Sequence, residues 1–278
     1  MDGLMTQLPE SPATDELSDE RANACRMYDY LLGGSHNVDI DQSALDKLLE
    51  VAPTTPFVAR ENRAYMRRVV RYLAAEAGIK QFLDLGSGIP TAGDTNLHNI
   101  VHGIDRRIRV VYVDRERVAV EEANELLEGN PNAEAFEADI RDTSYVLSHP
   151  VTQRQIDFTE PLALVTTGVF PFIPDSDNPV GIVATYRDAC PSGSYLALSH
   201  ALTAEHWPGD IAKRVLDIYK ENVQSMFPRT FEQVRDFFTG YTLVEPGLVS
   251  TPAWRPDEEL TEDQKAYIRA VSGLGIKP

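Results

Sequence analysis

The sequence predicts an α/β protein, in which a mainly parallel β-sheet has helices on both faces and a group of helices in front of it. From residue 80 onward, short apolar runs alternate with amphipathic helical segments, which is typical of a parallel sheet. Before residue 80, apolar residues recur only at helical spacing. We therefore expect an acidic, flexible arm over residues 1–20, a helical cap or lid over 21–78, and a sheet-based core over 79–278.

The helices ahead of the sheet are marked by their start and stop signals. The first ends at Gly33-Gly34, and the third begins at Thr55-Pro56 and ends at Gly78, where glycine is the common stop residue. The second shows apolar residues on one side only. The expected helices cover residues 21–32, 41–51 and 55–77.

The remaining elements alternate along the chain. Buried apolar runs predict strands, and the last two of these are the weakest signals. The expected strands are 81–85, 110–113, 134–138, 162–167, 194–200, 241–249 and 266–276. Between them, helical spacing and a capping box that starts at Thr230 predict helices over 116–127, 181–189, 211–226 and 230–238.

Ligands of open α/β sheets bind beyond the carboxyl ends of the parallel strands. Residues that end or follow the predicted strands are therefore expected to be neighbours. They are 84–88, Asp114, Asp139, 166–172 and Ser199-His200.

A glycine-rich turn follows the first predicted strand. In Asp84-Leu-Gly86-Ser87-Gly88, glycine permits both the sharp turn and the close approach of a ligand to the backbone. The dinucleotide pattern G-x-G-x-x-G is only partly met, because Thr91 stands at the third glycine position. The Asp84 carboxylate can receive a ligand ammonium or hydrogen-bond the amides of its own loop. A plain strand-to-helix turn is the alternative.

Two further acidic residues end the next strands. Asp114 is placed to accept the hydroxyls of a ribose, although it lies slightly further from Gly88 than the usual spacing of about 20 residues. A helix N-cap is the alternative role, and both roles are compatible. Asp139 can accept from an adenine amine, with the Ile140 amide beside it, although Asp after a strand is often only a turn former.

This series of residues resembles one class of nucleotide-binding enzymes. The series consists of the motif Asp-x-Gly-x-Gly, an acidic residue placed to bind a ribose, and a third Asp. It is similar to the series found in class I, Rossmann-like methyltransferases that use S-adenosyl-L-methionine. The resemblance narrows to a bacterial S-adenosyl methyltransferase family, formerly a domain of unknown function, over residues 21–278. It is carried by the sequences at 26–37, 59–63, 82–91, 111–114, 138–141, 173–175, 193–196, 199–200, 246–249, 254–256 and 275–278.

The resemblance implies a seven-stranded cofactor-binding sheet with an N-terminal helical cap. It also implies roles for particular residues: Gly86, Ser87 and Gly88 at the amino-acid part of the cofactor, and Thr166 at its methionine portion. Tyr28, Gly33 and Gly34 would form a lid, for which an ordinary helix stop is the alternative, and Arg63 would face the cofactor carboxylate. The predicted cofactor-binding residues are Tyr28, Gly33, Gly34, Arg63, Gly86, Ser87, Gly88, Asp114, Arg115, Asp139, Ile140 and Thr166.

The reaction expected from the resemblance is methyl transfer to an acceptor that the sequence does not identify. His200 is a candidate general base, with a structural hydrogen-bonding role as the alternative. Pro171 stands where the family often has His, so a His base there is not available. No metal is expected, because the histidines lack ligand spacing. Residues 171–207 are expected to line the acceptor pocket.

Charge and composition indicate the partners and the compartment. The net charge of −17 disfavours nucleic acids and anionic membranes and favours a small-molecule acceptor. Cys25 and Cys190 have no metal or disulfide spacing, and neither a membrane-spanning run nor a signal segment is found, so we expect a cytoplasmic protein. The alternatives are a non-catalytic S-adenosyl-methionine sensor or partner-binding module, and an NAD-dependent oxidoreductase.

Overall fold

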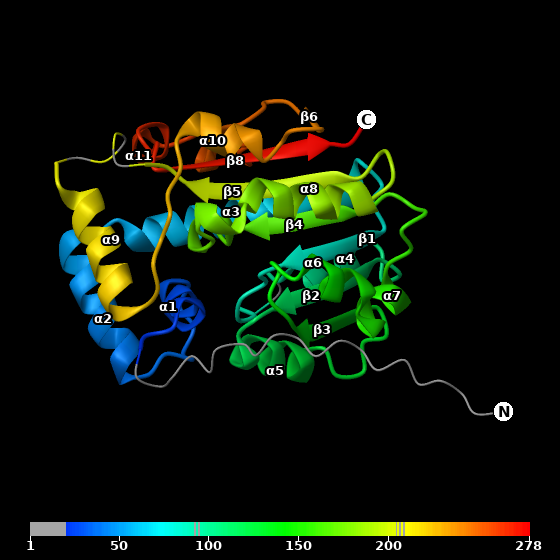
Figure 1. Ribbon diagram of the computed structural model, residues 1–278, viewed down its shortest axis with the longest axis horizontal. Helices are drawn as coiled ribbons and strands as arrows, with labels where there is room; N and C mark the ends of the chain where they lie inside the picture. Colours follow the sequence, from blue (N-terminus) through cyan, green and yellow to red (C-terminus); the bar gives the residue numbers. More distant parts are fainter. Residues whose placement is uncertain (1–20, 92, 94, 204, 206, 208) are drawn as a thin grey trace.

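The computed structural model describes residues 21–91, 93, 95–203, 205, 207 and 209–278, so the predicted acidic arm over residues 1–20 lies outside the described residues. The predicted α/β architecture is confirmed (Figure 1). The sheet has the strand order β3-β2-β1-β4-β5-β8-β6, and the short β7 pairs with β8. The strands are β1 Gln81–Leu85, β2 Arg109–Asp114, β3 Ala133–Glu137, β4 Ala163–Thr167, β5 Tyr195–Ala201, β6 Thr242–Leu243, β7 Val249–Ser250 and β8 Ala270–Ile276.

The parallel half of the sheet has β1 at its centre. Leu83 pairs with Val111 of β2 on one side and with Leu164 of β4 on the other, and all three side chains are buried. Strands covered by helices on both faces are largely apolar, so these runs could be recognised in the sequence, although β1 also contains the buried Asp84. The strands β1 to β5 end at the same edge, whereas β8 runs antiparallel to β5.

The strand expected over residues 241–249 is split in the structure. Its two ends form β6 and β7, which both pair with β8. The break falls at Pro246, which has no N–H for a ladder hydrogen bond, and at Gly247, whose φ is 89°. The sheet therefore contains a short eighth strand in addition to the seven expected.

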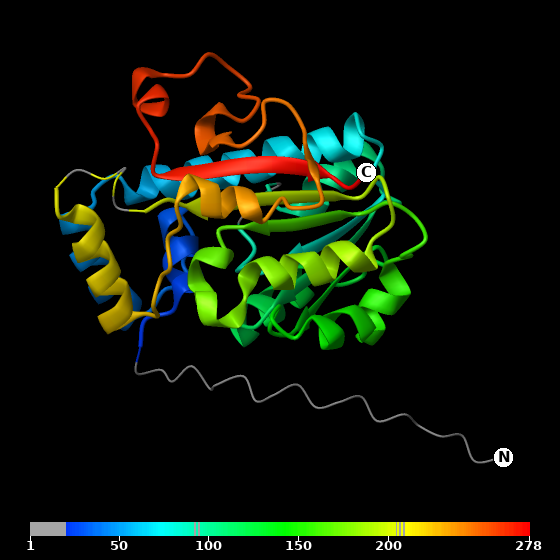
Figure 2. The same ribbon diagram turned by 45° about the horizontal axis from the view of Figure 1, so that its top comes forward.

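Helices cover both faces of the sheet, as predicted (Figure 2). The sequence did not predict α4, α6, α7 and α11, of which the last three are six residues or shorter. The helices are α1 Ala24–Leu31, α2 Asp39–Val51, α3 Thr55–Ala75, α4 Leu97–Ile104, α5 Arg117–Leu126, α6 Thr143–Ser148, α7 Pro150–Gln155, α8 Pro179–Ala189, α9 Ile211–Asn222, α10 Phe231–Asp236 and α11 Glu262–Lys265. The 3₁₀ turns η1 Phe170–Phe172, η2 Asp175–Asp177 and η4 Thr251–Ala253 complete the elements.

Three apolar cores hold these layers together. One lies between the sheet and α6, α7, α8 and α10, and a second lies between the sheet and α3, α4 and α5. The third is separate from the sheet and joins α1, α2 and α9 through side chains such as Met27, Leu48 and Val215. The N-terminal helices are therefore completed by α9, which comes from the predicted core.

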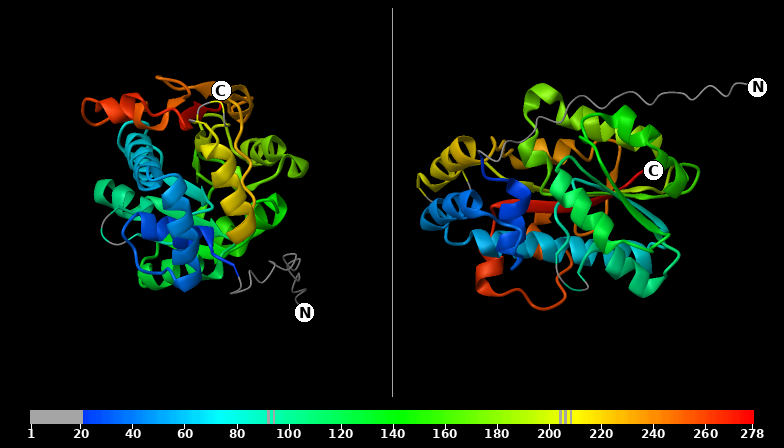
Figure 3. Two further views of the ribbon diagram at one scale, coloured as in Figure 1. Left: turned by 90° about the vertical axis from the view of Figure 1, so that its left-hand side faces the viewer. Right: turned by 90° about the horizontal axis from the view of Figure 1, so that it is seen from below.

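This helical group stands at the carboxyl edge of the parallel strands (Figure 1, Figure 3). The start of α1 is fixed by Asn23, whose side chain accepts hydrogen bonds from the amides of Cys25 and Arg26. The buried Asp41 of α2 accepts from the Asn23 amide and forms an ion pair of 2.6 Å with Arg26. None of the helices in the described part of the chain is both long and apolar enough to cross a membrane.

Candidate functional site

A pocket lies at the carboxyl edge of β1 to β4, between the strand ends and the helices α1 and α9. It encloses about 1130 Å³ of empty space, part of which is open to solvent. The predicted residues that line it are Tyr28, Arg63, Gly86, Ser87, Gly88, Asp114, Arg115, Asp139 and Ile140. Gly33, Gly34, Thr166 and His200 lie outside its lining.

The conformation of the glycine turn is fixed by its backbone geometry and by hydrogen bonds to Asp114. Gly86 has a φ of 79°, and a Cβ built there would lie 2.4 Å from Val169, so a side chain at this position is excluded. Gly88 also has a positive φ of 67°, but its Cβ would enter open space. The Gly88 amide donates to Asp114 Oδ2 at 2.7 Å, and the Glu116 amide donates to Oδ1 at 2.9 Å. Asp114 thus fixes the loop, and burial raises its pKa to about 6.

Behind this turn, Asp84 and Arg63 line a smaller side pocket with Asn96 and His98. Burial raises the pKa of Asp84 to about 7, although the nearby Arg63 opposes this shift. Arg63 Nη2 donates to Thr91 Oγ1 and to Asn96 Oδ1 at 2.9 and 2.8 Å. Its Nε is buried and has no hydrogen-bond partner among the described residues. A buried unpaired donor beside a buried carboxyl group is suited to a ligand that carries both a carboxylate and an ammonium.

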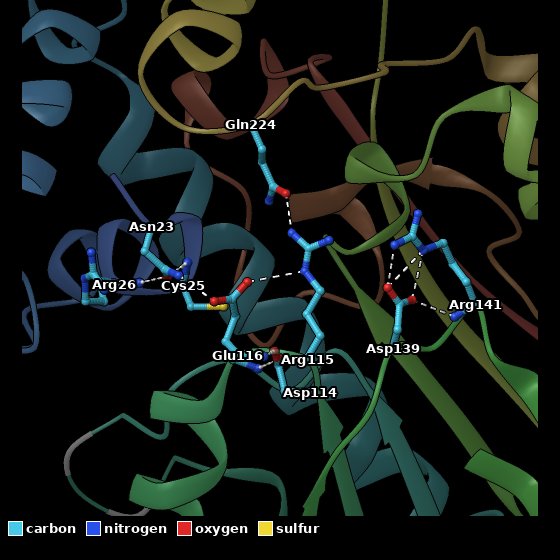
Figure 4. A network of polar contacts seen from close by, with 10 residues as sticks. Asn23, Cys25, Arg26, Asp114, Arg115, Glu116, Asp139, Arg141 and Gln224 are labelled. Atoms are coloured by element: carbon cyan, nitrogen blue, oxygen red, sulfur yellow. Dashed lines mark hydrogen bonds and ion pairs between the residues drawn. The ribbon is translucent and has the colours of Figure 1, made fainter. Parts of the chain in front are cut away.

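Asp139 and Ile140 line the pocket beyond the end of β3. The Asp139 carboxylate pairs with Arg141 Nη2 at 2.6 Å (Figure 4). Arg141 Nη1 also pairs with Asp177 at 2.8 Å. Burial raises the pKa of Asp139, but the hydrogen bonds from Arg141 outweigh this effect and lower it. Asp139 is therefore an ionised hydrogen-bond acceptor at the mouth of the pocket.

A polar network ties the helical group to the strand ends (Figure 4). Asn23 Nδ2 of α1 donates to Glu116 Oε2 at 2.6 Å, and Arg115 lies between Glu116 and Gln224, donating to Gln224 Oε1. Gln224 follows α9, so the network connects three distant parts of the chain. Asn23, Glu116 and Gln224 were not predicted as site residues. The proximity of Gln224 depends on how α9 packs, whereas Glu116 directly follows the predicted Asp114 and Arg115.

The far half of the pocket is apolar and aromatic. Leu31 of α1, Val169 and Phe172 after β4, and Tyr219 of α9 line it. The Phe172 and Tyr219 ring centroids are 6.0 Å apart. Of residues 171–207, which were expected to line the acceptor pocket, Phe172 and Ile173 do so among those described. Pro171 is buried outside the lining, and its carbonyl accepts from the Phe227 amide.

Gly33 and Gly34 have a structural explanation that does not involve the pocket. Gly33 ends α1 with a φ of 91°. At Gly34, a Cβ would lie 2.1 Å from the buried Asp29 carboxylate, and the Gly34 amide donates to the Asp29 carbonyl at 2.9 Å. Their place in the structure matches the alternative of an ordinary helix stop.

Thr166 points to the opposite face of the sheet from the neighbouring Thr167, because side chains alternate along a strand. Thr166 is buried, and its Oγ1 has no partner among the described residues, whereas Thr167 lines the pocket. The strand end was identified correctly, but the residue next to Thr166 occupies the position expected for it.

His200 is buried and engaged at both ring nitrogens. Its Nδ1 donates to the Ala201 carbonyl at 2.8 Å, and its Nε2 accepts from Arg229 Nη1 at 2.9 Å. Burial, together with the Arg229 charge, lowers its pKa to about 3. The imidazole is therefore neutral and has no free lone pair for a substrate proton. This geometry favours the structural hydrogen-bonding role, which was the alternative, over that of a general base.

The whole chain is similar to known proteins. Residues 10–278 match the model of a family described as S-adenosyl methyltransferase. A protein from Thermobifida fusca YX, provisionally named a methyltransferase, has a crystal structure with 36% identity and a TM-score of 0.86, covering 96% of this chain and 97% of that one. A DUF574 family protein from Streptomyces avermitilis MA-4680 has 37% identity and a TM-score of 0.86, covering 93% of this chain and 98% of the other. No curated protein matches the sequence.

Proposed function

Since this chain belongs to the S-adenosyl methyltransferase family, we propose that its strand-end pocket binds S-adenosyl-methionine and that it methylates a small-molecule acceptor. The observation that carries the proposal is the convergence of the glycine turn, Asp114 and Asp139 on one pocket. They follow β1, β2 and β3, which are neighbours in the sheet. This order matches that of the amino-acid part, the ribose and the adenine in the cofactor.

The residues of the pocket fit the parts of this cofactor. Asp114 already accepts two backbone amides, but a carboxylate has about four lone-pair sites, so it can also accept from ribose hydroxyls. Asp139 and the Ile140 amide would hold the adenine. The unpaired Arg63 Nε would meet the cofactor carboxylate, and Asp84 its ammonium.

When bound, the cofactor supplies a methyl group that its positive sulfur has already activated. The main task of the chain is then to hold the acceptor in line with that methyl group, and such positioning can contribute about 7–11 kcal/mol in favourable cases. The apolar half, with Leu31, Phe172 and Tyr219, would exclude water from the reacting atoms. His200 contributes no base, because Arg229 occupies its lone pair.

Two observations support a small-molecule acceptor. The net charge of −17 would repel a polyanion. The pocket also continues past the strand ends to α1 and α9, so it offers space beyond the part assigned to the cofactor. A pocket of this form favours an enzyme over a sensor closed around its ligand.

Thermal unfolding with separate ligands tests the cofactor class. We expect S-adenosyl-methionine and S-adenosyl-homocysteine to stabilise the protein by about 2.7 kcal/mol at 100 times their Kd, whereas NAD does not. For a chain of this size, that corresponds to several degrees, at roughly 2–4 °C per kcal/mol. Stabilisation by NAD alone would overturn the proposal in favour of an oxidoreductase.

The raised pKa of Asp84 predicts that cofactor affinity depends on pH. Between about pH 4 and 7, the folded protein binds more protons at this carboxyl than the unfolded chain does, so its contribution to stability falls as pH rises. The ligand ammonium needs the ionised form. We therefore expect the Kd of S-adenosyl-homocysteine, measured by calorimetry, to fall roughly tenfold from pH 6 to pH 8.

The matched variant for this experiment is Asp84→Asn, which keeps the shape and removes the titration. Its affinity should be lower and should change only about twofold between pH 6 and 8, because Asp114, whose pKa is about 6, still titrates there. A wild-type Kd that does not change over this range would contradict the role assigned to Asp84.

A further inference from the structure

The residues that line the pocket fall into two halves according to the elements that supply them: a strand-end half, from the strand ends and α3, and a half from α1, η1 and α9. These halves differ in charge. The strand-end half contains the carboxylates of Asp114, Glu116 and Asp139 and the guanidinium groups of Arg63, Arg115 and Arg141. Among the described residues, the half made by α1, η1 and α9 presents no Asp, Glu, Lys, Arg or His to the pocket. Burial raises the pKa of the Tyr219 hydroxyl to about 12, so this group also stays neutral at physiological pH.

Asn62 of α3 and Tyr28 of α1 form an uncharged polar anchor that joins these two halves. Asn62 Nδ2 donates to Tyr28 Oη at 3.0 Å, and the Ser199 hydroxyl donates to Asn62 Oδ1 at 2.5 Å. Tyr28 Oη in turn donates to the Ala59 carbonyl at 3.2 Å. Both Asn62 and Tyr28 line the pocket. Two fixed neutral groups therefore face the ligand space.

The neighbouring backbone leaves room for this anchor. Gly168, directly after β4, has a φ of 78°, and a Cβ there would lie 3.3 Å from Asn62 Nδ2. A larger residue would crowd the amide as well as strain the turn. The second N–H of Asn62 Nδ2 and a lone pair of Tyr28 Oη have the capacity for a ligand hydroxyl.

We propose that the acceptor is an uncharged, flat aromatic molecule with a hydroxyl group. Its ring would lie against Phe172 and Tyr219, and its hydroxyl group would meet Asn62 and Tyr28. The apolar walls favour a ring by burial and by offset or edge-to-face contact with their own rings. A charged acceptor would lose its hydration without gaining an ionic partner in this half of the pocket. This inference rests on the proposed function, because the charged half must be filled by the cofactor.

Three probes with one ring system test the charge preference. Calorimetric titrations use the full chain saturated with S-adenosyl-homocysteine, and the probes are 2-naphthol, 2-naphthoate and 2-(aminomethyl)naphthalene, which is a cation at pH 7. We expect 2-naphthol to bind with a Kd at least tenfold lower than either charged probe. Tighter binding of a charged probe, or no binding of any probe up to 1 mM, would overturn the inference.

Two variants locate the binding site of the probe. Phe172→Ala should weaken 2-naphthol binding about tenfold, whereas Phe231→Ala, which removes an exposed ring of α10 outside the pocket, should leave it unchanged. Asn62→Asp keeps the shape and adds a negative charge, so it should weaken 2-naphthol and strengthen the cationic probe. Equal effects of Phe172→Ala and Phe231→Ala would place the probe elsewhere and overturn the inference.

The stabilisation of each protein by S-adenosyl-homocysteine separates the two proposals. If the cofactor product raises the melting temperature and the probes fail as described, only the acceptor class is wrong. If the cofactor product does not bind to the wild-type protein, the proposed function itself fails.

Discussion

Gly88→Leu is expected to abolish the stabilisation of the protein by S-adenosyl-homocysteine. A Cβ at Gly88 meets no atom within 4 Å, so a leucine side chain would extend into the space assigned to the cofactor. The positive φ of 67° adds roughly 1–2 kcal/mol of backbone strain, which lowers stability but leaves a folded protein to measure. Thermal unfolding with and without the ligand gives both quantities.

Gly33→Leu is the matched control for this variant. Gly33 also has a positive φ, at 91°, and open space around its Cβ, but it lies outside the pocket lining. It should lose similar stability and keep its response to S-adenosyl-homocysteine. If both variants lost the response, that result would support the hypothesis of a lid around Gly33. If neither did, the cofactor would not lie against Gly88.

Asp114→Asn is expected to raise the Kd of S-adenosyl-homocysteine by at least about 100-fold. Ribose hydroxyls would lose a charged acceptor, and each hydrogen bond to a charged group contributes about 1.5–3 kcal/mol. The new Nδ2 cannot accept from the amide of Gly88 or Glu116, so the glycine turn also loses one of its anchors. Titration calorimetry at pH 8, where the wild-type carboxylate is ionised, measures the effect.

Asp157→Asn provides the comparison for Asp114→Asn. Asp157 also accepts from a backbone amide, that of Thr159 at 2.9 Å, but it lies in a surface turn away from the pocket. Its replacement should leave the Kd within about twofold of the wild-type value. An Asp114→Asn protein that bound with equal affinity would remove Asp114 from the proposed ribose contact.

The sequence determined the fold and the family because those signals are local or repeated. The buried strands β1, β2 and β4 are largely apolar runs, and their alternation with helical segments indicates a parallel sheet. The sequence did not predict α4, although Leu97, Val101 and Ile104 have helical spacing. The broken strand at β6 and β7 shows the same limit, since Pro246 and Gly247 interrupt the pattern on which the prediction depends.

Only the tertiary structure decided which residues share the pocket and which of them are free to act. Tyr219 and Gln224 reach it because α9 buries its apolar side against α2, a contact between distant segments that no local spacing encodes. His200 stands at the predicted strand end, but whether its imidazole is available depends on Arg229, which the fold brings to 2.9 Å. A sequence specifies residue types and periodicity. Burial and hydrogen-bond partners arise from packing between distant segments, and they determine the charge and the availability of each group.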